Sequence, residues 1–225
     1  MSKPKGEGPF PAVILMHGCG GIQQSHFRWA AILNSEGYIT LIPDSFRPRS
    51  IAYLCKSDVH PALHRQRILD AHGALAYLRN LPDVDSARIG IIGWSQGATM
   101  TLETISSGSI LKSTEPWFRA AITFYPYCVA DRRIDLPVLI MVGEVDEWSP
   151  PGPCRELASN NRPPDSIEVV TYPLAFHAFD MVEIADGFAI EGPSGIQHWL
   201  KFDPQAYQDA INRVRAFLAL HLSDQ

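Results

Sequence analysis

The sequence contains no hydrophobic run long enough to cross a membrane, since a transmembrane helix needs about 18 or more consecutive apolar residues. The first residues, MSKPKGEGPFP, also lack the apolar core of a secretory signal peptide. The chain therefore predicts a cytoplasmic protein without a membrane partner. A periplasmic or secreted protein is expected instead if an upstream segment has been removed.

An excess of basic residues is also missing. The 225 residues include 19 Lys and Arg against 24 Asp and Glu, which gives a formal net charge of −5. Nucleic-acid-binding domains usually carry a basic patch, so this balance argues against a nucleic-acid partner. The remaining candidate partner is a small molecule, and the oligomeric state is left open.

Cysteines are few, and none forms a CxxC pair or another spacing typical of zinc. We therefore expect no metal site. Each cysteine is either a small buried apolar side chain or one half of a disulfide. The four residues are Cys19, Cys55, Cys128 and Cys154.

Short apolar segments alternate with helical patterns along the chain. The segments are rich in branched residues and apolar on both faces, as in a parallel sheet covered by helices. This alternation predicts a doubly wound, mostly parallel α/β sheet in one domain, residues 1–225. Its function should lie beyond the carboxyl ends of the strands. We expect strands at 12–16, 38–42, 89–93, 120–125, 138–142 and 167–172, and helices beginning near Ser25 and at 61–80, 96–107 and 204–222.

The segment Gly93-Trp94-Ser95-Gln96-Gly97 matches G-x-S-x-G between an expected strand and an expected helix. In that setting the pattern predicts a sharp turn that exposes the serine hydroxyl as a nucleophile. The amide of Gln96 would then lie at a helix N-terminus. The alternative is a glycine-rich turn with a capping serine.

A serine nucleophile needs a base and an acid, which in this arrangement follow it along the chain. The strand 138–142 leads to three acids, of which Asp146 is favoured because it lies farther from the strand and has a short, stiff side chain. His177 directly follows the strand 167–172 and is the favoured base. The rival acids are Glu144 and Glu147, and the rival histidines are His198 and His221.

The glycine-rich segment ILMHGCGG, residues 14–21, follows the first strand and can supply an oxyanion-binding amide. The amide of Cys19 is the first candidate and that of Gly18 the second. His17 precedes the nucleophile and more plausibly orients this loop than acts as a base. A simple flexible turn is the alternative.

At this point the chain resembles the dienelactone hydrolase-like family of the α/β-hydrolase fold. The segments HGCGG, PDSFRPR, GWSQGA, GEVDEWSP and FHAFD occur in the family's order and spacing. The resemblance implies a Ser95–Asp146–His177 triad and an ester hydrolase that needs no cofactor. Relatives that open dienelactones have a cysteine nucleophile, and they carry a carboxylate-binding arginine where this chain has Met181. The usual amino-terminal strands of the fold are also missing from the expected set of strands.

The favoured function is hydrolysis of neutral esters of small or aromatic acids through an acyl-enzyme. The alternatives are a lactone hydrolase of the dienelactone type, a peptidase or acyl transferase with the same triad, and a non-catalytic ligand-binding protein. Arg47 and Arg49 could restore a positive patch, although solvated loop charges are the simpler interpretation. The predicted substrate-binding residues are Trp94, Tyr125, Trp148, Phe179 and Met181, with Phe124, Tyr127 and Phe176 as further aromatic candidates.

Cys128 follows the strand 120–125, and Cys154 follows the loop after the next strand. If these strands are neighbours, both cysteines lie at the same edge of the sheet, which predicts a disulfide between them. Such a bond would favour an oxidising compartment. Cys19 is expected to stay reduced, because its predicted role uses only its backbone amide.

Overall fold

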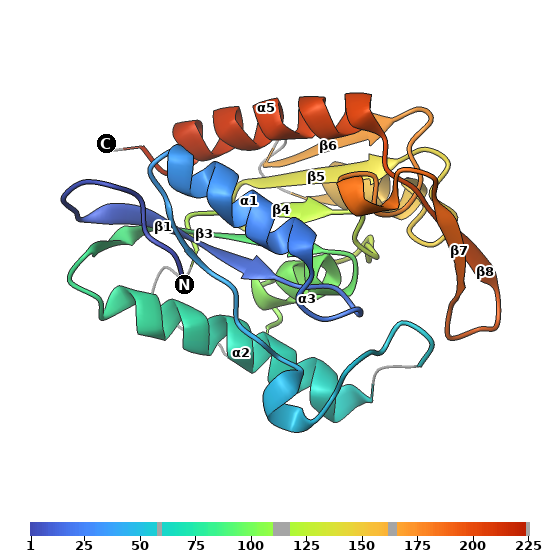
Figure 1. Ribbon diagram of the computed structural model, residues 1–225, viewed down its shortest axis with the longest axis horizontal. Coiled ribbons are helices and arrows are strands. Elements are labelled where there is room, and N and C mark those ends of the chain that lie inside the picture. The colour runs from blue at the N-terminus through green and yellow to red at the C-terminus, as the bar shows by residue number, and fades with distance from the viewer. Residues whose placement is uncertain (58–59, 110–117, 162–165, 224–225) are drawn as a thin grey trace.

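The computed structural model describes residues 1–57, 60–109, 118–161 and 166–223. Six parallel strands form one sheet in the order β2-β1-β3-β4-β5-β6 (Figure 1). This confirms the predicted α/β sheet. The strands are β1 (Phe10–Met16), β2 (Ile39–Leu41), β3 (Val84–Trp94), β4 (Ala120–Phe124), β5 (Val138–Gly143) and β6 (Ile167–Tyr172).

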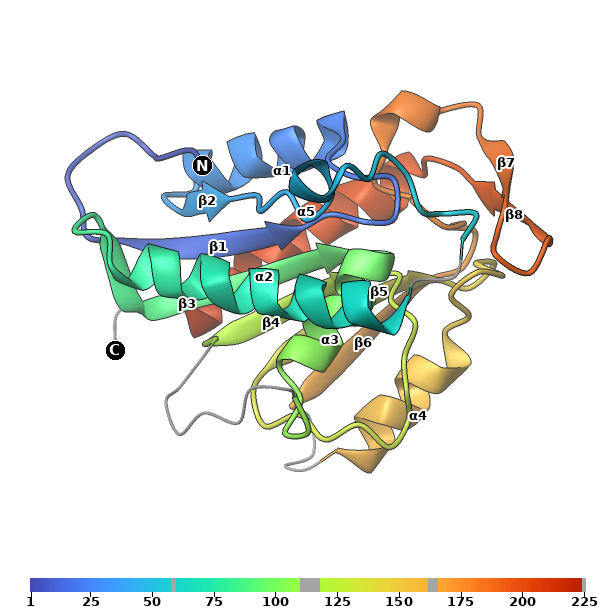
Figure 2. The ribbon, with the colours of Figure 1, turned by 90° about the horizontal axis from the view of Figure 1, so that it is seen from below.

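In the described part of the chain, five α-helices cover the two faces of the sheet. Figures 1 and 2 show α1 and α5 side by side on one face and the other three on the opposite face. Among the described residues, no helix is long and apolar enough to span a bilayer. The helices are α1 (Gln24–Ser35), α2 (Pro61–Arg79), α3 (Gln96–Thr104), α4 (Gly152–Asn160) and α5 (Pro204–His221), with short 3₁₀ turns at Arg47–Arg49 and Val182–Ile184.

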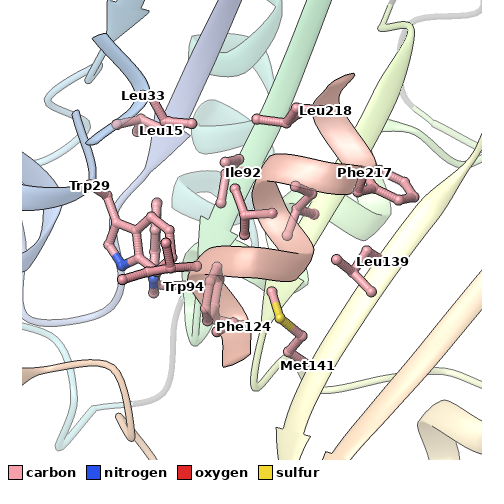
Figure 3. Packing of buried hydrophobic residues seen from close by; sticks show 14 of the residues in the cluster. Leu15, Trp29, Leu33, Ile92, Trp94, Phe124, Leu139, Met141, Phe217 and Leu218 are labelled. Carbon is pink, nitrogen blue, oxygen red and sulfur yellow. The ribbon is translucent and has the colours of Figure 1, made fainter. Parts of the chain in front are cut away.

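The buried strand residues alternate between two hydrophobic clusters, because successive side chains of a strand point to opposite faces. In β1, Val13 and Leu15 pack under α1 and α5, whereas Ile14 packs toward α2. Figure 3 shows the first cluster, in which the rings of Trp94 and Phe124 are stacked with centroids 5.3 Å apart. Burial on both faces explains why these strands read as continuous apolar runs.

Three features differ most from the sequence-based expectation. The helix α4 was not among the predicted helices. The strand β3 begins at Val84, five residues before the predicted start at residue 89. An antiparallel hairpin, β7 (Phe188–Glu191) and β8 (Gln197–Leu200), was not predicted; it lies beyond the carboxyl ends of the sheet strands (Figure 1). Most of its residues are at least partly exposed, so the hairpin lacks the buried alternation that identifies a strand.

Candidate active site

Ser95 lies in the sharp turn between β3 and α3. Its φ of 52° and ψ of −121° are unusual for a residue with a side chain. The turn requires glycine on both sides. A Cβ atom on Gly97 would lie 2.2 Å from the carbonyl oxygen of Met16, and one on Gly93 would lie 2.5 Å from that of Gly97. Strand, turn and helix therefore have the geometry that the G-x-S-x-G pattern predicts.

The structure brings Ser95, His177 and Asp146 together from three separate loops. His177 Nε2 lies 2.9 Å from Ser95 Oγ, and His177 Nδ1 lies 2.8 Å from Asp146 Oδ2. The other oxygen of Asp146 accepts the backbone N–H groups of Trp148 and Ser149, each at 2.9 Å. Both Asp146 and His177 are buried. The carboxylate is thus fixed by its own loop while it holds the imidazole.

The rival acids and histidines lie elsewhere. Glu144 is exposed and forms an ion pair with Arg155, and Glu147 is exposed as well. His198 stacks on Trp148 with ring centroids 4.8 Å apart, and burial lowers its pKa. His221 contacts Phe217 at the end of α5. None of these side chains has a hydrogen bond to Ser95.

His17 orients the loop after β1. Its Nε2 accepts the backbone N–H of Ser45 at 3.2 Å, so Nδ1 carries the proton and donates to the Gly18 carbonyl at 2.8 Å. Burial, and then the neighbouring Arg67 charge, lowers the pKa of His17 to about 4. A neutral, fully bonded imidazole of this kind is a structural group, as the sequence indicated.

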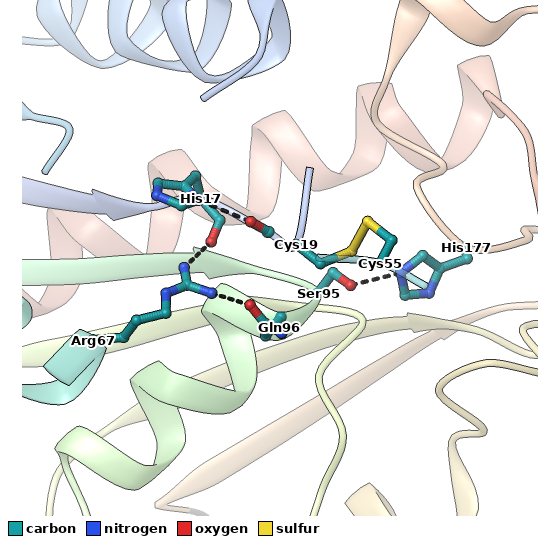
Figure 4. Close-up of a disulfide and its surroundings, with 8 residues drawn as sticks. His17, Cys19, Cys55, Arg67, Ser95, Gln96 and His177 are labelled. Atoms are coloured by element: carbon teal, nitrogen blue, oxygen red, sulfur yellow. Dashed lines mark hydrogen bonds between the residues drawn. A yellow bond between two sulfur atoms is a disulfide. The ribbon is translucent and has the colours of Figure 1, made fainter. Parts of the chain in front are cut away.

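Cys19 is not reduced. It forms a disulfide with Cys55, whose Cα lies 4.9 Å away (Figure 4). The expectation of a free thiol was wrong because a disulfide uses only the side chain and leaves the backbone amide available. Leu54 also donates its N–H to the Cys19 carbonyl at 2.9 Å. The segment from Ile51 to Ser57 is thereby fastened to the loop beside Ser95. The second disulfide joins Cys128 and Cys154, the predicted pair.

Two cavities meet at Ser95. The first encloses about 160 Å³ and is lined mainly by apolar and aromatic residues. The second, of about 500 Å³, opens toward α3 and includes Gln96, Thr99 and His64. Ser95, Trp148 and both cysteines of the Cys19–Cys55 disulfide border the two cavities. The hydroxyl is therefore accessible from two sides, and the disulfide lies in the wall between them.

The model of the dienelactone hydrolase family matches residues 1–222 of the chain. The chain belongs to this family. It is therefore a hydrolase that acts on esters. A protein of Bradyrhizobium sp. named "Probable 2-oxo-3-(5-oxofuran-2-ylidene)propanoate lactonase" is 26% identical over 99% of this chain and 88% of its own length.

Two solved structures show the same fold at low identity. A thermophilic esterase of Thermogutta terrifontis with bound propionate has a TM-score of 0.70 and 19% identity, over 99% of this chain and 89% of its own. A dienelactone hydrolase-like promiscuous phosphotriesterase, P91, from metagenomic libraries has a TM-score of 0.69 and 20% identity, with the same coverage of both chains.

Four of the five predicted substrate-binding residues of this family member line the first cavity: Trp94, Tyr125, Trp148 and Met181. Phe179 does not line it, which corrects the prediction. Its side chain is fully buried in the core against Phe124 and Tyr172, because it points to the sheet rather than to the solvent side of its loop. The sequence analysis missed the lining residues contributed by other segments, namely His26, Tyr53, Phe188, Ile190 and Leu200.

A buried carboxylate supports the aromatic wall of this cavity. Asp180 accepts hydrogen bonds from Trp29 Nε1 at 2.7 Å, Trp94 Nε1 at 2.8 Å and the Tyr125 hydroxyl at 2.6 Å. Burial raises the pKa of Asp180. No sequence motif predicted this network, because its members come from α1, from the ends of β3 and β4 and from the loop after β6. It fixes the orientation of Trp94 and of Tyr125, whose ring centroid lies 4.5 Å from that of His177.

Proposed function

We propose that the protein is a serine hydrolase that cleaves carboxylic esters through an acyl-enzyme on Ser95. The proposal is carried by one observation, the unbroken hydrogen-bond chain from Ser95 Oγ through His177 to Asp146. A serine hydroxyl becomes a useful nucleophile when an oriented imidazole can accept its proton.

In this scheme, Ser95 Oγ attacks the ester carbonyl while His177 Nε2 takes its proton. Asp146 holds the Nδ1–H and stabilises the imidazolium. The amides of Cys19 and Gln96 bind the oxyanion in this proposal. Both residues line the second cavity together with Ser95. The leaving alkoxide takes the proton from His177. Water then releases the acid by the same steps in reverse, so the scheme requires no metal or organic cofactor.

The first cavity supports a neutral substrate with a short or aromatic acid part. Within the described part of the chain, its lining includes no lysine or arginine. Met181 lies in this lining where dienelactone-opening relatives carry a carboxylate-binding arginine. Arg49 pairs with Asp70 instead, and the Arg47 side chain is 92% exposed. A carboxylate placed in this cavity would lose its hydration without gaining a cation, which is costly.

A lactone is the second candidate substrate, because the Bradyrhizobium relative is named as a lactonase. The substrate in that name is a propanoate and carries a carboxylate, whereas the cavity of this chain favours a neutral lactone. The same steps would open a lactone, whose alkoxide stays attached to the acyl-enzyme until water releases both ends. A panel that includes simple lactones beside open-chain esters distinguishes the two substrates.

The test combines a fluorophosphonate probe with p-nitrophenyl esters of graded acyl length. We expect the probe to label Ser95, and Ser95→Ala to lower kcat by about 10⁴-fold or more. Turnover near the wild-type rate in Ser95→Ala would contradict the proposed nucleophile. Absence of labelling would instead favour a ligand-binding protein.

The charge of the substrate is tested in a separate comparison. An uncharged ester should exceed an isosteric carboxylate-bearing ester in kcat/KM by about tenfold or more. Met181→Arg should narrow or reverse this ratio. If the wild type preferred the charged ester and substitution of Arg47 or Arg49 removed that preference, the neutral-substrate proposal would be contradicted. The lactone hydrolase of the dienelactone type would then be favoured.

A further inference from the structure

Arg67 is a fully buried cation that has no carboxylate partner among the described residues. It lies on α2, and the side chain is 0% exposed. Its two hydrogen-bond acceptors are neutral: the side-chain oxygen of Gln96 and the backbone carbonyl of His17 (Figure 4). The guanidinium also lies over the ring of Phe46, 5.0 Å from its centroid.

Asp70, the acid whose charge acts on Arg67, is already paired. Both carboxylate oxygens of Asp70 accept hydrogen bonds from Arg49 at 2.8 Å. Burial lowers the pKa of Arg67 to about 10, so the guanidinium remains charged at neutral pH. A buried charge with only neutral partners is costly for folding. Such a cost is common where a site is arranged for a charge that develops during a reaction.

The two acceptors of Arg67 belong to the two segments that flank Ser95. Gln96 begins α3 and follows the serine directly. His17 begins the loop that carries Gly18 and Cys19. One rigid guanidinium thus fixes the loop after β1 relative to the N-terminus of α3, with its two bonds directed to separate segments.

The bond to the His17 carbonyl also has an electronic effect. The C=O and N–H of a trans peptide point in opposite directions, so a cation on the His17 oxygen lies behind the N–H of Gly18. Polarisation of this peptide unit strengthens the Gly18 N–H as a donor. Gly18 was the second candidate for the oxyanion amide, and it directly precedes Cys19.

We propose that Arg67 is a positioning residue of the oxyanion site. It holds the two amide-bearing segments in register, and its buried positive charge favours the oxyanion that forms when Ser95 attacks. This inference rests on the proposed function of Ser95. It adds a residue, two turns of helix α2 from its N-terminus, that none of the sequence motifs contains.

The experiment compares Arg67→Met, Arg67→Lys and the control Arg49→Met. Arg49 also ties α2 to the rest of the chain, but through an ion pair with Asp70 and a bond to Ser45. For each variant the measurements are kcat and KM for the best p-nitrophenyl ester, the melting temperature, and two inhibition constants. One inhibitor is a trifluoromethyl ketone with the same acyl chain, which forms an oxyanion adduct with serine. The other is the matched methyl ketone, which binds without one.

Arg67→Met should lower kcat by about 100-fold with KM changed less than about threefold, since displacing a reacting geometry has effects of this size. Binding of the trifluoromethyl ketone should weaken by a similar factor, while the methyl ketone binds almost as before. Arg67→Lys keeps the charge but loses the two-pronged guanidinium. Its kcat and its affinity for the trifluoromethyl ketone should lie between those of the wild type and of Arg67→Met. Arg49→Met should lower the melting temperature and leave kcat within about twofold, the usual range for a residue outside the site.

Equal weakening of both ketones, or unchanged kcat in Arg67→Met, would overturn the inference. If Arg67→Met does not fold, Arg67→Lys decides, because wild-type kcat and ketone binding in that variant would exclude a positioning role for the guanidinium. If Arg49→Met lost as much kcat as the Arg67 variants, the loss would be explained by disturbed packing of α2 and not by a specific role of Arg67, which would also overturn the inference. If the wild-type enzyme neither binds the trifluoromethyl ketone nor labels at Ser95, the proposed function fails first and this inference with it.

Discussion

At the scale of single residues, Asp146 and Glu144 show how the backbone selects one of two nearby acids. Glu144 continues directly from β5 and points to solvent, where Arg155 neutralises it. Asp146 follows a turn closed by its own N–H and the Gly143 carbonyl, and its carboxylate accepts the N–H groups of Trp148 and Ser149. These two bonds hold one oxygen still and leave the other for His177.

Asp146→Asn should therefore lower kcat by on the order of 10⁴-fold, because the amide would hold His177 in the wrong tautomer or lose its bond. Glu144→Gln removes only a surface ion pair and should change kcat by less than about threefold. Steady-state kinetics of the two variants, with circular dichroism as a check of folding, provide the comparison. The opposite ranking would transfer the acid role to Glu144.

Ser95, Asp146 and His177 could be located from sequence because each lies in the turn or loop that follows a buried strand, and the strands could be recognised. Tyr53, Cys55 and Arg67 could not be located in this way. They come from the loop after β2 and from the middle of α2, and their place beside Ser95 depends on how the chain returns over the sheet. For the same reason, the partner of Cys19 was missed, although Cys128 and Cys154 follow neighbouring strands and were paired.

At the scale of elements, the glycines of the chain differ sharply in what surrounds them. The Cβ of an alanine at position 97 would collide with the carbonyls of Met16 and His17, at 2.2 and 2.4 Å. These atoms are backbone, so the loop that carries the proposed oxyanion amide of Cys19 would have to shift. Gly73 has open space around it in the exposed part of α2.

Gly97→Ala should consequently lower the free energy of unfolding by about 1–3 kcal/mol through overpacking, and should also lower kcat. Gly73→Ala should raise the free energy of unfolding by up to about 1 kcal/mol, since alanine favours a helix interior. Urea unfolding of both variants measures these changes. A Gly97→Ala protein with unchanged stability and activity would show that the turn is looser than the contacts indicate.

At the scale of the whole molecule, the two disulfides lie in different parts of the structure, one beside Ser95 and one between a loop and α4. Cys19–Cys55 borders both cavities at Ser95. Cys128–Cys154 joins the loop after β4 to α4, and it closes a segment with a sequence separation of 26 residues. Disulfides persist mainly in oxidising compartments, so we expect the protein to function in one.

Cys154→Ala and Cys55→Ala should each lower the free energy of unfolding by about 2–4 kcal/mol, as expected for lost loop constraints. Only Cys55→Ala should also lower kcat, because it releases the segment that lines the cavities. Thiol titration of the unreduced, denatured wild-type protein should find no free thiol. Four free thiols, or equal losses of kcat in both variants, would contradict these assignments.

Two buried histidines affect the stability of the whole chain. Burial, and then the Arg67 charge, lowers the pKa of His17 from 6.5 to about 4. Burial, and then the nearby His17, lowers the pKa of His26 to about 3. His26 Nδ1 accepts the Gln23 N–H at 3.0 Å, and its ring packs against Trp94. Both imidazoles are therefore neutral in the folded protein above pH 5.

Below pH 6.5, the unfolded chain takes up protons on these histidines that the folded protein does not. The free energy of unfolding should consequently fall as the pH drops from 6.5 toward 4, by up to about 1.4 kcal/mol per pH unit for each histidine. Above pH 7, His17 and His26 are neutral in both the folded and the unfolded protein, so they should add no pH dependence to the free energy of unfolding. Urea unfolding at pH 7.5, 6 and 5 measures the slope. Burial also lowers the pKa of His72 to about 4, so His26→Phe should make the slope shallower without removing it, because one of several histidines with a lowered pKa is lost. An identical slope in His26→Phe and the wild type would mean that His26 binds its proton equally well in the folded and unfolded states.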